Sequence, residues 1–577
     1  MNKIKKQIKR SFPLLIIFGL LSSLLAGLVF NINLNFKQDT EDFIKWTSEV
    51  QADTATTEVT VKNAPPAFTV NAAENPISSS TSPVNVGGSI SFTATANDPE
   101  DNDYYLIICS SDSIIASSTG GAPSCGDTQF CVSALTGDTT EANCTYSNVA
   151  DPGAETDDWY AFVCDDHSTE SACSSANQGT GDSGNPIYIN HAPSFDSVST
   201  TDDNKDPGGT FTIEAVVTDS DTEGGVDELY LYVCSTNNWA TSTGCAATTI
   251  CSGTSTSPNI SCQYVDTAPT ADQDYTYYAF IKDWHEMPAS GNSKTNTYTI
   301  NNVAPTVSNV VFNNGNNITL NIKNAAEVVV YATSTSVVDQ NGCTDLSQAT
   351  STVYLSSVTG GAYCDANDNN CYHINSVDCV LSECSGDSDS TATYVCSTSL
   401  AYHAIPTIDS GSNPYSSDNW MVQMTAFDEA LNGSATTSPG VEIGTTIALE
   451  VNEATIDYGI IEAGQNSGSN NATTTIINYG NSPLDNDISG TDMTKGADWF
   501  GADNQEYSLN NFSWGTGTDL SSTTPVTVDI ITPRPTDSDN VYDLILWGIG
   551  IPSGQPSGDY GGINTFSATL DGDGNWN

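Results

Sequence analysis

Apolar and polar residues alternate along several short segments of this chain, as they do in strands with one buried face. Ser89–Ala96 (SISFTATA) and Thr210–Val217 both show this alternation. Each is followed by an acidic turn and then by a second apolar segment, Tyr104–Cys109 in one case and Leu229–Cys234 in the other. Helical periodicity is nearly absent beyond the first fifty residues. The pattern predicts an all-β protein built of sandwich-like modules.

Longer units repeat around these strands. Three aromatic-rich, strand-forming segments each stop at an acidic turn, and they are Asp158–His167, Asp274–His285 and, more loosely, Asp418–Asp428. The units begin at matching segments that contain an Ala-Pro pair, here called the start segments: Asn63–Pro66, Asn190–Pro193 and Asn302–Pro305. The start segments are about one domain length apart, which is too long for a solenoid repeat. The chain therefore reads as a row of separate modules.

The repeats divide the chain into a leader, a membrane segment and four modules. From residue 445 on, the cysteines vanish and the texture of the sequence changes. The expected parts are a cytoplasmic basic leader (1–10), a signal anchor or transmembrane helix (11–34), a juxtamembrane linker (35–57), three disulfide-bonded β-sandwich modules (58–190, 191–302 and 303–444, the third with a cysteine-rich insert) and a cysteine-free β-sandwich (445–577).

The charge of the chain is strongly one-sided. It holds 14 Lys and Arg against 70 Asp and Glu, and five of those bases fall within the first ten residues. Nucleic-acid binding is excluded in practice, because too few cations remain to neutralise phosphates. The acidity is consistent with solubility at a cell surface or with the binding of cations.

Phe12–Phe30 is an uncharged apolar segment of the length that one membrane span requires. As a helix it would be about 28 Å long. The basic leader before it and the acidic chain behind it place the N-terminus inside and the modules outside. We expect an uncleaved signal anchor, with a cleaved signal peptide as the main alternative.

The cysteines indicate export to an oxidising compartment. Each module holds an even number of the 16 cysteines, namely six, four, six and none. No Cys-x-x-Cys occurs, so disulfides are favoured over metal ligation. In each of the first two modules, the last two of four matching cysteines flank a turn symmetrically, which predicts a pair across a hairpin. The predicted pairs are Cys131–Cys144, Cys251–Cys262, Cys109–Cys125, Cys234–Cys245 and a local Cys164–Cys173. The pairing in the third module stays open.

Two acidic turns are candidate calcium sites. They hold Asp98, Glu100, Asp101 and Asp103 in the first module and Asp219, Asp221, Glu223 and Asp227 at the matching place in the second. Calcium prefers six to eight oxygen ligands, which turns of this kind supply. A third cluster, Asp365–Asn369, copies the start of an EF-hand loop but lacks its glycine and its final glutamate. In so acidic a chain, solvated turns are the default interpretation and calcium binding is the alternative; no other cofactor is expected.

No catalytic arrangement is found in the sequence. Gly181–Asn185 has the residues of a serine-protease nucleophile loop, but its position in the repeat is that of a turn before the last strand. Ile408–Ser412 has the form of half an aspartic-protease dyad and has no second half. The five histidines form no metal-ligand spacing. We therefore expect no enzyme.

The start segments and the step TATANDPEDNDYY resemble those of prokaryotic surface proteins with tandem immunoglobulin-like, fibronectin type III-like and cadherin-like modules, similar to those predicted in uncultivated small-genome bacteria. The ending IPSGQPSGDYGGINTFSAT resembles the last hairpin of bacterial Ig-like domains. The resemblance implies a membrane-anchored, structural or adhesive surface protein that displays binding modules to a surface protein or glycan. A secreted filament or envelope component, and an exported hydrolase with accessory modules, are the alternatives.

Overall fold

The computed structural model describes residues 56–174, 178–179, 186–221, 228–256, 258–408, 412–572 and 574–576. The expected anchor at Phe12–Phe30 lies outside these residues. Within them, no helix has the length and apolar character needed to cross a membrane. The helical segments described are three-residue 3-10 turns: η1 (Asn313–Gly315), η2 (Cys343–Asp345), η3 (Gly361–Tyr363), η4 (Ser376–Asp378) and η5 (Ala502–Asn504). The described chain is thus all-β.

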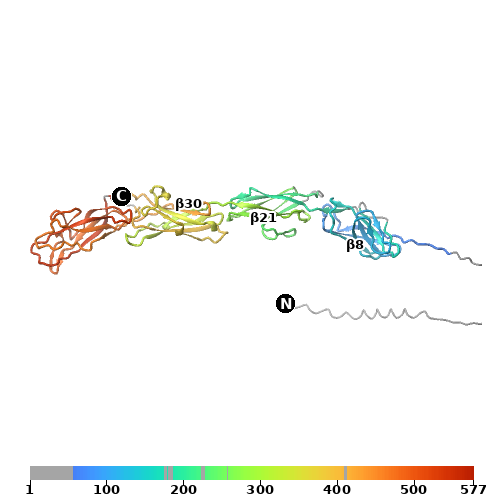
Figure 1. Cartoon of the computed structure of the whole chain (residues 1–577), viewed down its shortest axis with the longest axis horizontal. Coiled ribbons are helices and arrows are strands. Elements are labelled where there is room, and N and C mark those ends of the chain that lie inside the picture. The colour runs from blue at the N-terminus through green and yellow to red at the C-terminus, as the bar shows by residue number, and fades with distance from the viewer. Residues whose placement is uncertain are drawn as a thin grey trace, which may run out of the picture. The chain divides into compact units, whose positions relative to one another are not determined.

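Strands within residues 67–190 (module 1) form three main sheets, coloured blue to cyan in Figure 1 around β8. One sheet holds β1 (Ala67–Asn75), β3 (Ser89–Asn97) and β8 (Glu141–Ser147). A second holds β11 (Gln178–Gly179), β10 (Tyr160–Asp165), β4 (Tyr104–Cys109) and β7 (Gln129–Val132). The third holds β2 (Val84–Asn85), β12 (Ile187–Asn190) and β9 (Thr156–Asp157), and its β2–β12 pair is parallel.

Residues 194–300 (module 2) repeat this plan with two main sheets, green in Figure 1 around β21. The first holds β13 (Ser194–Thr201), β15 (Thr210–Thr218) and β20 (Asn259–Val265). The second holds β14 (Asn204–Lys205), β22 (Lys294–Ile300), β21 (Asp274–Lys282), β16 (Leu229–Cys234) and β19 (Thr249–Ser255), with β14 parallel to β22. The strand order, with a short early strand parallel to the last one, is that of an immunoglobulin-like sandwich.

Residues 306–436 (module 3) form two four-stranded antiparallel sheets, yellow in Figure 1 around β30. One holds β23 (Thr306–Phe312), β24 (Val328–Val338), β28 (Thr391–Leu400) and β27 (Cys379–Ser382). The other holds β26 (Cys371–Ile374), β25 (Gln348–Leu355), β29 (Trp420–Phe427) and β30 (Asn432–Thr436). Because β26 and β27 come from the cysteine-rich segment, that segment completes both sheets rather than standing outside them.

Residues 449–570 (module 4) form a five-stranded and a three-stranded sheet. The first holds β31 (Leu449–Val451), β32 (Ala472–Asn478), β39 (Tyr542–Ile549), β36 (Gln505–Ser508) and β37 (Thr518–Asp519). The second holds β38 (Val526–Thr532), β33 (Leu484–Gly490) and β40 (Asn564–Leu570). Three two-stranded hairpins complete the chain: β5 (Ile114–Ile115) with β6 (Ser124–Cys125), β17 (Trp239–Ala240) with β18 (Gly244–Cys245), and β34 (Met493–Lys495) with β35 (Asp498–Phe500).

Each module buries its own apolar core, because one face of each strand turns inward. In β15, Phe211, Ile213, Ala215 and Val217 are buried while the residues between them are half-buried or exposed. The clusters around Phe92, Phe211, Trp420 and Trp547 are separate from one another. Independent cores are what allow modules of this kind to be joined in series.

All sixteen cysteines are paired, and every pair lies within one module. The first two modules contain the five pairs expected from the sequence, Cys109–Cys125, Cys131–Cys144, Cys164–Cys173, Cys234–Cys245 and Cys251–Cys262. The expected placement of the Cys131–Cys144 pair across a hairpin was wrong. Cys131 lies on β7 and Cys144 on β8, which belong to different sheets, so this disulfide links the two sheets. Module 3 adds Cys343–Cys384, Cys364–Cys371 and Cys379–Cys396.

Modules 3 and 4 are joined by two buried cationic side chains. Arg534 of module 4 donates from Nη1 to Asn369 Oδ1 at 2.7 Å and to the His403 carbonyl at 3.1 Å. Lys323 of module 3 donates from Nζ to the carbonyls of Ser538 and Asp539 at 2.9 and 3.1 Å. Since each cation is satisfied by oxygens of the neighbouring module, the two modules are hydrogen-bonded as one body.

Candidate metal centre at the module start segments

In the first two modules, the start segment contacts the aspartate that ends the aromatic strand. Asn63 Nδ2 donates to Asp165 Oδ2 at 2.7 Å, and Asn190 Nδ2 donates to Asp283 Oδ2 at 2.8 Å. Both aspartates are completely buried. The pKa of Asp283 is raised to about 6, mainly by burial, while its hydrogen bonds oppose the rise. The same position in module 3 is Asp428, which is also buried.

The next residue of each start segment binds a second acidic or amide side chain. The backbone N–H groups of Ala64, His191 and Val303 donate to Glu100 (3.4 Å), Asp221 (2.6 Å) and Asn341 (2.8 Å), respectively. Two positions before each acceptor stands an aspartate, which is Asp98, Asp219 or Asp339. The three modules therefore share one constellation: a start segment, an Asp-x-(Glu/Asp/Asn) turn and a strand-ending aspartate.

The third constellation brings carboxylates closest together. Ligand oxygens of Asp339, Asp345 and Asp428 all lie within 4.8 Å of one another. Asp339 is 0% exposed and Asp428 is 4% exposed. In all three residues the Oδ2 atom is buried and, within the described chain, has no hydrogen-bond partner, and the same is true of Asn302 Oδ1 in the start segment. Leaving such oxygens unpaired in a protein interior is costly.

The neighbouring carboxylates of this cluster favour the binding of a positive charge. Burial and, to a smaller extent, the negative charges of Asp345, Asp428 and Asp272 together raise the pKa of Asp339 to about 6. Burial also raises the pKa of Asp345, followed by the charges of Asp272, Asp428 and Glu429. A bound divalent cation would reverse this balance, because its charge favours the ionised form of every carboxylate around it. Carboxylate and amide oxygens suit calcium or magnesium rather than softer metals.

Of the eight carboxylates predicted as calcium ligands, four lie in these constellations. Asp98 is buried, with Oδ1 bound by the N–H of Glu100 and Oδ2 without a partner in the described chain. Glu100 lies in the same turn of module 1, and Asp219 and Asp221 lie in the matching turn of module 2. Asp101 and Asp103 are exposed. Glu223 and Asp227 lie outside the described residues.

Each constellation of modules 2 and 3 also touches the module before it. Asn341 Nδ2 donates to the Thr270 carbonyl of module 2 at 3.2 Å. His191 Nε2 lies 3.2 Å from Asp151 Oδ1 of module 1, and its Nδ1 lies 2.9 Å from Asp221 Oδ1. Burial opposes a charge on His191, but the two aspartates outweigh it and raise the pKa of the imidazole. A cation bound at either constellation would therefore lie at the junction between two modules.

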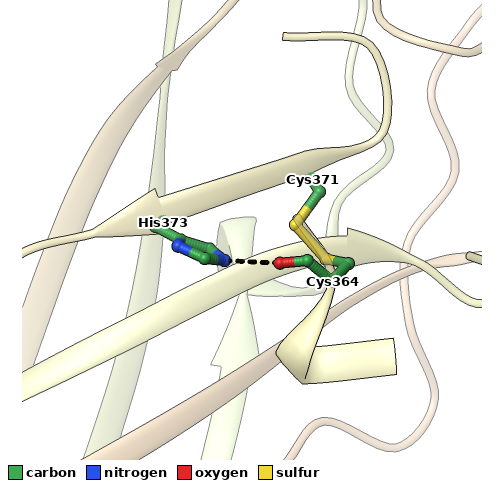
Figure 2. Close-up of side chains that lie close together, drawn as sticks. All are labelled: Cys364, Cys371 and His373. Atoms are coloured by element: carbon green, nitrogen blue, oxygen red, sulfur yellow. Dashed lines mark hydrogen bonds between the residues drawn. A yellow bond between two sulfur atoms is a disulfide. The ribbon is translucent and has the colours of Figure 1, made fainter. Parts of the chain in front are cut away.

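A second cluster, Cys364, Cys371 and His373, has the residue types of a metal site but not the chemistry. The two sulfur atoms form a disulfide, so neither supplies the thiolate that a metal requires. His373 Nε2 lies 2.9 Å from the Cys364 carbonyl oxygen (Figure 2). The cluster is a structural clasp for the loop between the two cysteines.

Sequence reasoning missed the third constellation and the strand-ending aspartates. The turn Asp339–Asn341 holds a single acid, so it does not stand out in so acidic a chain. Asp165, Asp283 and Asp428 were recognised only as strand ends. The matching place of each after its aromatic strand was the signal that could have found them.

Gly181–Asn185 and Asp409–Gly411 lie outside the described residues.

The comparisons with known proteins give low similarity throughout. No family model and no curated protein matches the chain. Solved structures that align include the Escherichia coli adhesin FdeC (12% identity, 67% of this chain and 100% of that one, TM-score 0.21) and a marsupial T cell receptor (10%, 64% and 99%, TM-score 0.26). Domains FN1–FN3 of chicken CNTN1 also align (8%, 62% and 98%, TM-score 0.16). At these scores the assignment of immunoglobulin-like modules rests on strand order.

Proposed function

We propose that this chain is a non-enzymatic surface protein with a structural or adhesive role. Phe12–Phe30 anchors it in the membrane, and its β-sandwich modules lie outside the cell, joined at junctions that bind calcium. The observation that carries the proposal is the set of buried, unpaired carboxylate oxygens at the start of module 3. The export signal, the paired cysteines and the acidic surface support an extracytoplasmic location.

Calcium is expected to stabilise the chain. A ligand at a hundred times its dissociation constant adds about 2.7 kcal/mol to the free energy of unfolding when it binds only the folded state. We expect calorimetric scans at pH 7 to show a higher melting temperature for the transition that includes module 3 when calcium is added. Asp339→Asn should abolish that shift. Without calcium, the same variant should be as stable as the parent or more stable, because it removes a buried charge from beside two others.

The matched control is Asp365→Asn, which removes an exposed acid from the EF-hand-like sequence of the same module. It should respond to calcium as the parent chain does. Calcium binding at the start of module 3 is refuted if the parent shows no shift, or if Asp339→Asn and the parent shift equally.

Protease treatment of intact cells tests the anchor. Antibodies to the juxtamembrane linker and to module 4 would follow the two ends of the exported chain. We expect a membrane-bound stub to survive while module 4 is lost. Recovery of the chain from the medium, beginning after residue 30, would refute the membrane anchor. It would favour a secreted filament or matrix component.

A further inference from the structure

Module 3 carries a hollow of about 460 Å³ on the outward face of the sheet β26-β25-β29-β30. Its floor is built from Thr350 and Thr352 of β25 and from Gln423 and Thr425 of β29. These residues alternate with buried ones that point into the core, so their side chains all project to the same outer face. Hollows of this size hold small organic ligands.

The floor is a regular grid of hydroxyl and amide groups. Thr350 lies opposite Thr425 and Thr352 lies opposite Gln423 in the register of the two strands. Within the described chain, none of these four side chains has a hydrogen-bond partner in the protein. Donors and acceptors therefore stand in fixed rows with their bonding capacity free.

Aromatic rings stand beside this floor. Phe427 lines the hollow from β29, and Tyr363 lines it from the turn η3, with 84% of its surface exposed. A tyrosine this exposed on a tight turn gains little from burial. A ring in such a place offers an apolar face to a ligand and a hydroxyl to its rim.

The turn that carries Tyr363 is held from several sides. Gly360 and Gly361 have φ of 90° and 57°, a backbone conformation that favours glycine. The next residue after Tyr363 is Cys364, which is bonded to Cys371 of β26, and its carbonyl oxygen lies 2.9 Å from His373 Nε2 (Figure 2). The clasp therefore fixes the backbone of the turn from which the exposed ring projects beside the hollow, which favours a preorganised binding residue.

No Asp, Glu, Lys or Arg lines the hollow, although the chain as a whole carries a net charge of −56. An anionic ligand would be repelled by the surrounding protein, and the lining offers it no Lys or Arg, only the imidazole of His373. A cationic ligand would find no carboxylate. The lining therefore fits a neutral molecule that presents many hydroxyl groups and an apolar face.

We propose that this hollow binds a neutral saccharide, with Tyr363 stacked on the C–H face of a sugar ring and Gln423 and the threonines bonded to its hydroxyls. The inference deepens the proposed adhesive function, on which it rests, by naming the class of ligand. It assigns the glycan contact to module 3 and makes the Cys364–Cys371 clasp a positioning element.

The test is binding of the purified full chain to an array of neutral and acidic glycans, followed by calorimetric titration with the strongest neutral oligosaccharide. We expect Tyr363→Ala and Gln423→Ala each to weaken binding about tenfold. Tyr363→Phe should retain most of the affinity, because the stacking face remains. The matched control is Tyr331→Ala, which removes a tyrosine that is 44% exposed on β24 of the other sheet and should leave binding unchanged.

Melting curves of each variant would establish that it is folded, and Tyr363 is exposed enough for its removal to leave the core intact. Binding of acidic glycans alone, binding of no glycan, or equal losses in Tyr363→Ala and Tyr331→Ala would overturn the proposal. The protease test and the calcium shift do not depend on this hollow. If they succeed while glycan binding fails, the saccharide site is refuted and the surface-protein proposal stands.

Discussion

Replacing Arg534 by leucine is expected to cost about 3–5 kcal/mol and to separate the unfolding of modules 3 and 4. Arg534 is only 3% exposed. Its Nη1 binds Asn369 Oδ1 and the carbonyls of His403 and Pro535, and its Nε binds the Trp576 carbonyl at 3.3 Å. Hydrogen bonds from a charged donor are worth about 1.5–3 kcal/mol each, and leucine would leave buried carbonyls without a donor.

Differential scanning calorimetry of the full chain measures this directly. The parent should show one transition for modules 3 and 4, and Arg534→Leu should show two, with the lower one shifted down. Lys205→Leu is the control, since the Lys205 side chain is 32% exposed and pairs with Asp202 on the surface, where such a pair contributes about 0–1 kcal/mol. Unchanged coupling in Arg534→Leu would show that the joint is held by other contacts.

Trp420→Ala is expected to destabilise module 3 by about 3–5 kcal/mol. Trp420 is completely buried at the start of β29, and its Nε1 donates to the Ile405 carbonyl at 2.9 Å. Its ring centroid lies 5.9 Å from that of Tyr372. The substitution removes the largest buried side chain of this core and leaves a cavity and an unpaired carbonyl behind.

The control for this experiment is Trp499→Ala, because Trp499 is 61% exposed on β35. Its removal should change stability by no more than about 0.5 kcal/mol. Both variants can be followed by chemical denaturation of the full chain, with the transition that includes module 3 identified by its shift in Trp420→Ala. A cost below about 1 kcal/mol for Trp420→Ala would mean that the core collapses around the gap.

The repeated sequence was sufficient to predict the pairs of cysteines in the first two modules. Cys131 and Cys251 recur at matching places with matching partners, so a pairing that suits one module must suit the other. Sequence could not show that β7 and β8 lie in different sheets, because the spacing of two cysteines does not reveal which strands pair. Nor could it reveal that β26 and β27 complete the sheets of module 3.

The candidate metal centre was only partly predictable for a related reason. The acidic turns at Asp98 and Asp219 are local features, and a local reading finds them. The contact of Asn190 with Asp283 joins residues 93 positions apart, so it exists only once the sandwich is closed. Burial then turned an unremarkable aspartate, Asp339, into the centre of the cluster.

The confinement of every disulfide within its own module has a consequence for a protein that is pulled. A bond between Cys343 and Cys384, which are 41 positions apart, keeps the segment between them from extending and withholds roughly 140 Å of contour length. Module 4 has no cysteine and can unravel completely. Under tension, each of the first three modules would therefore release less than its full contour length, whereas module 4 would release all of its own.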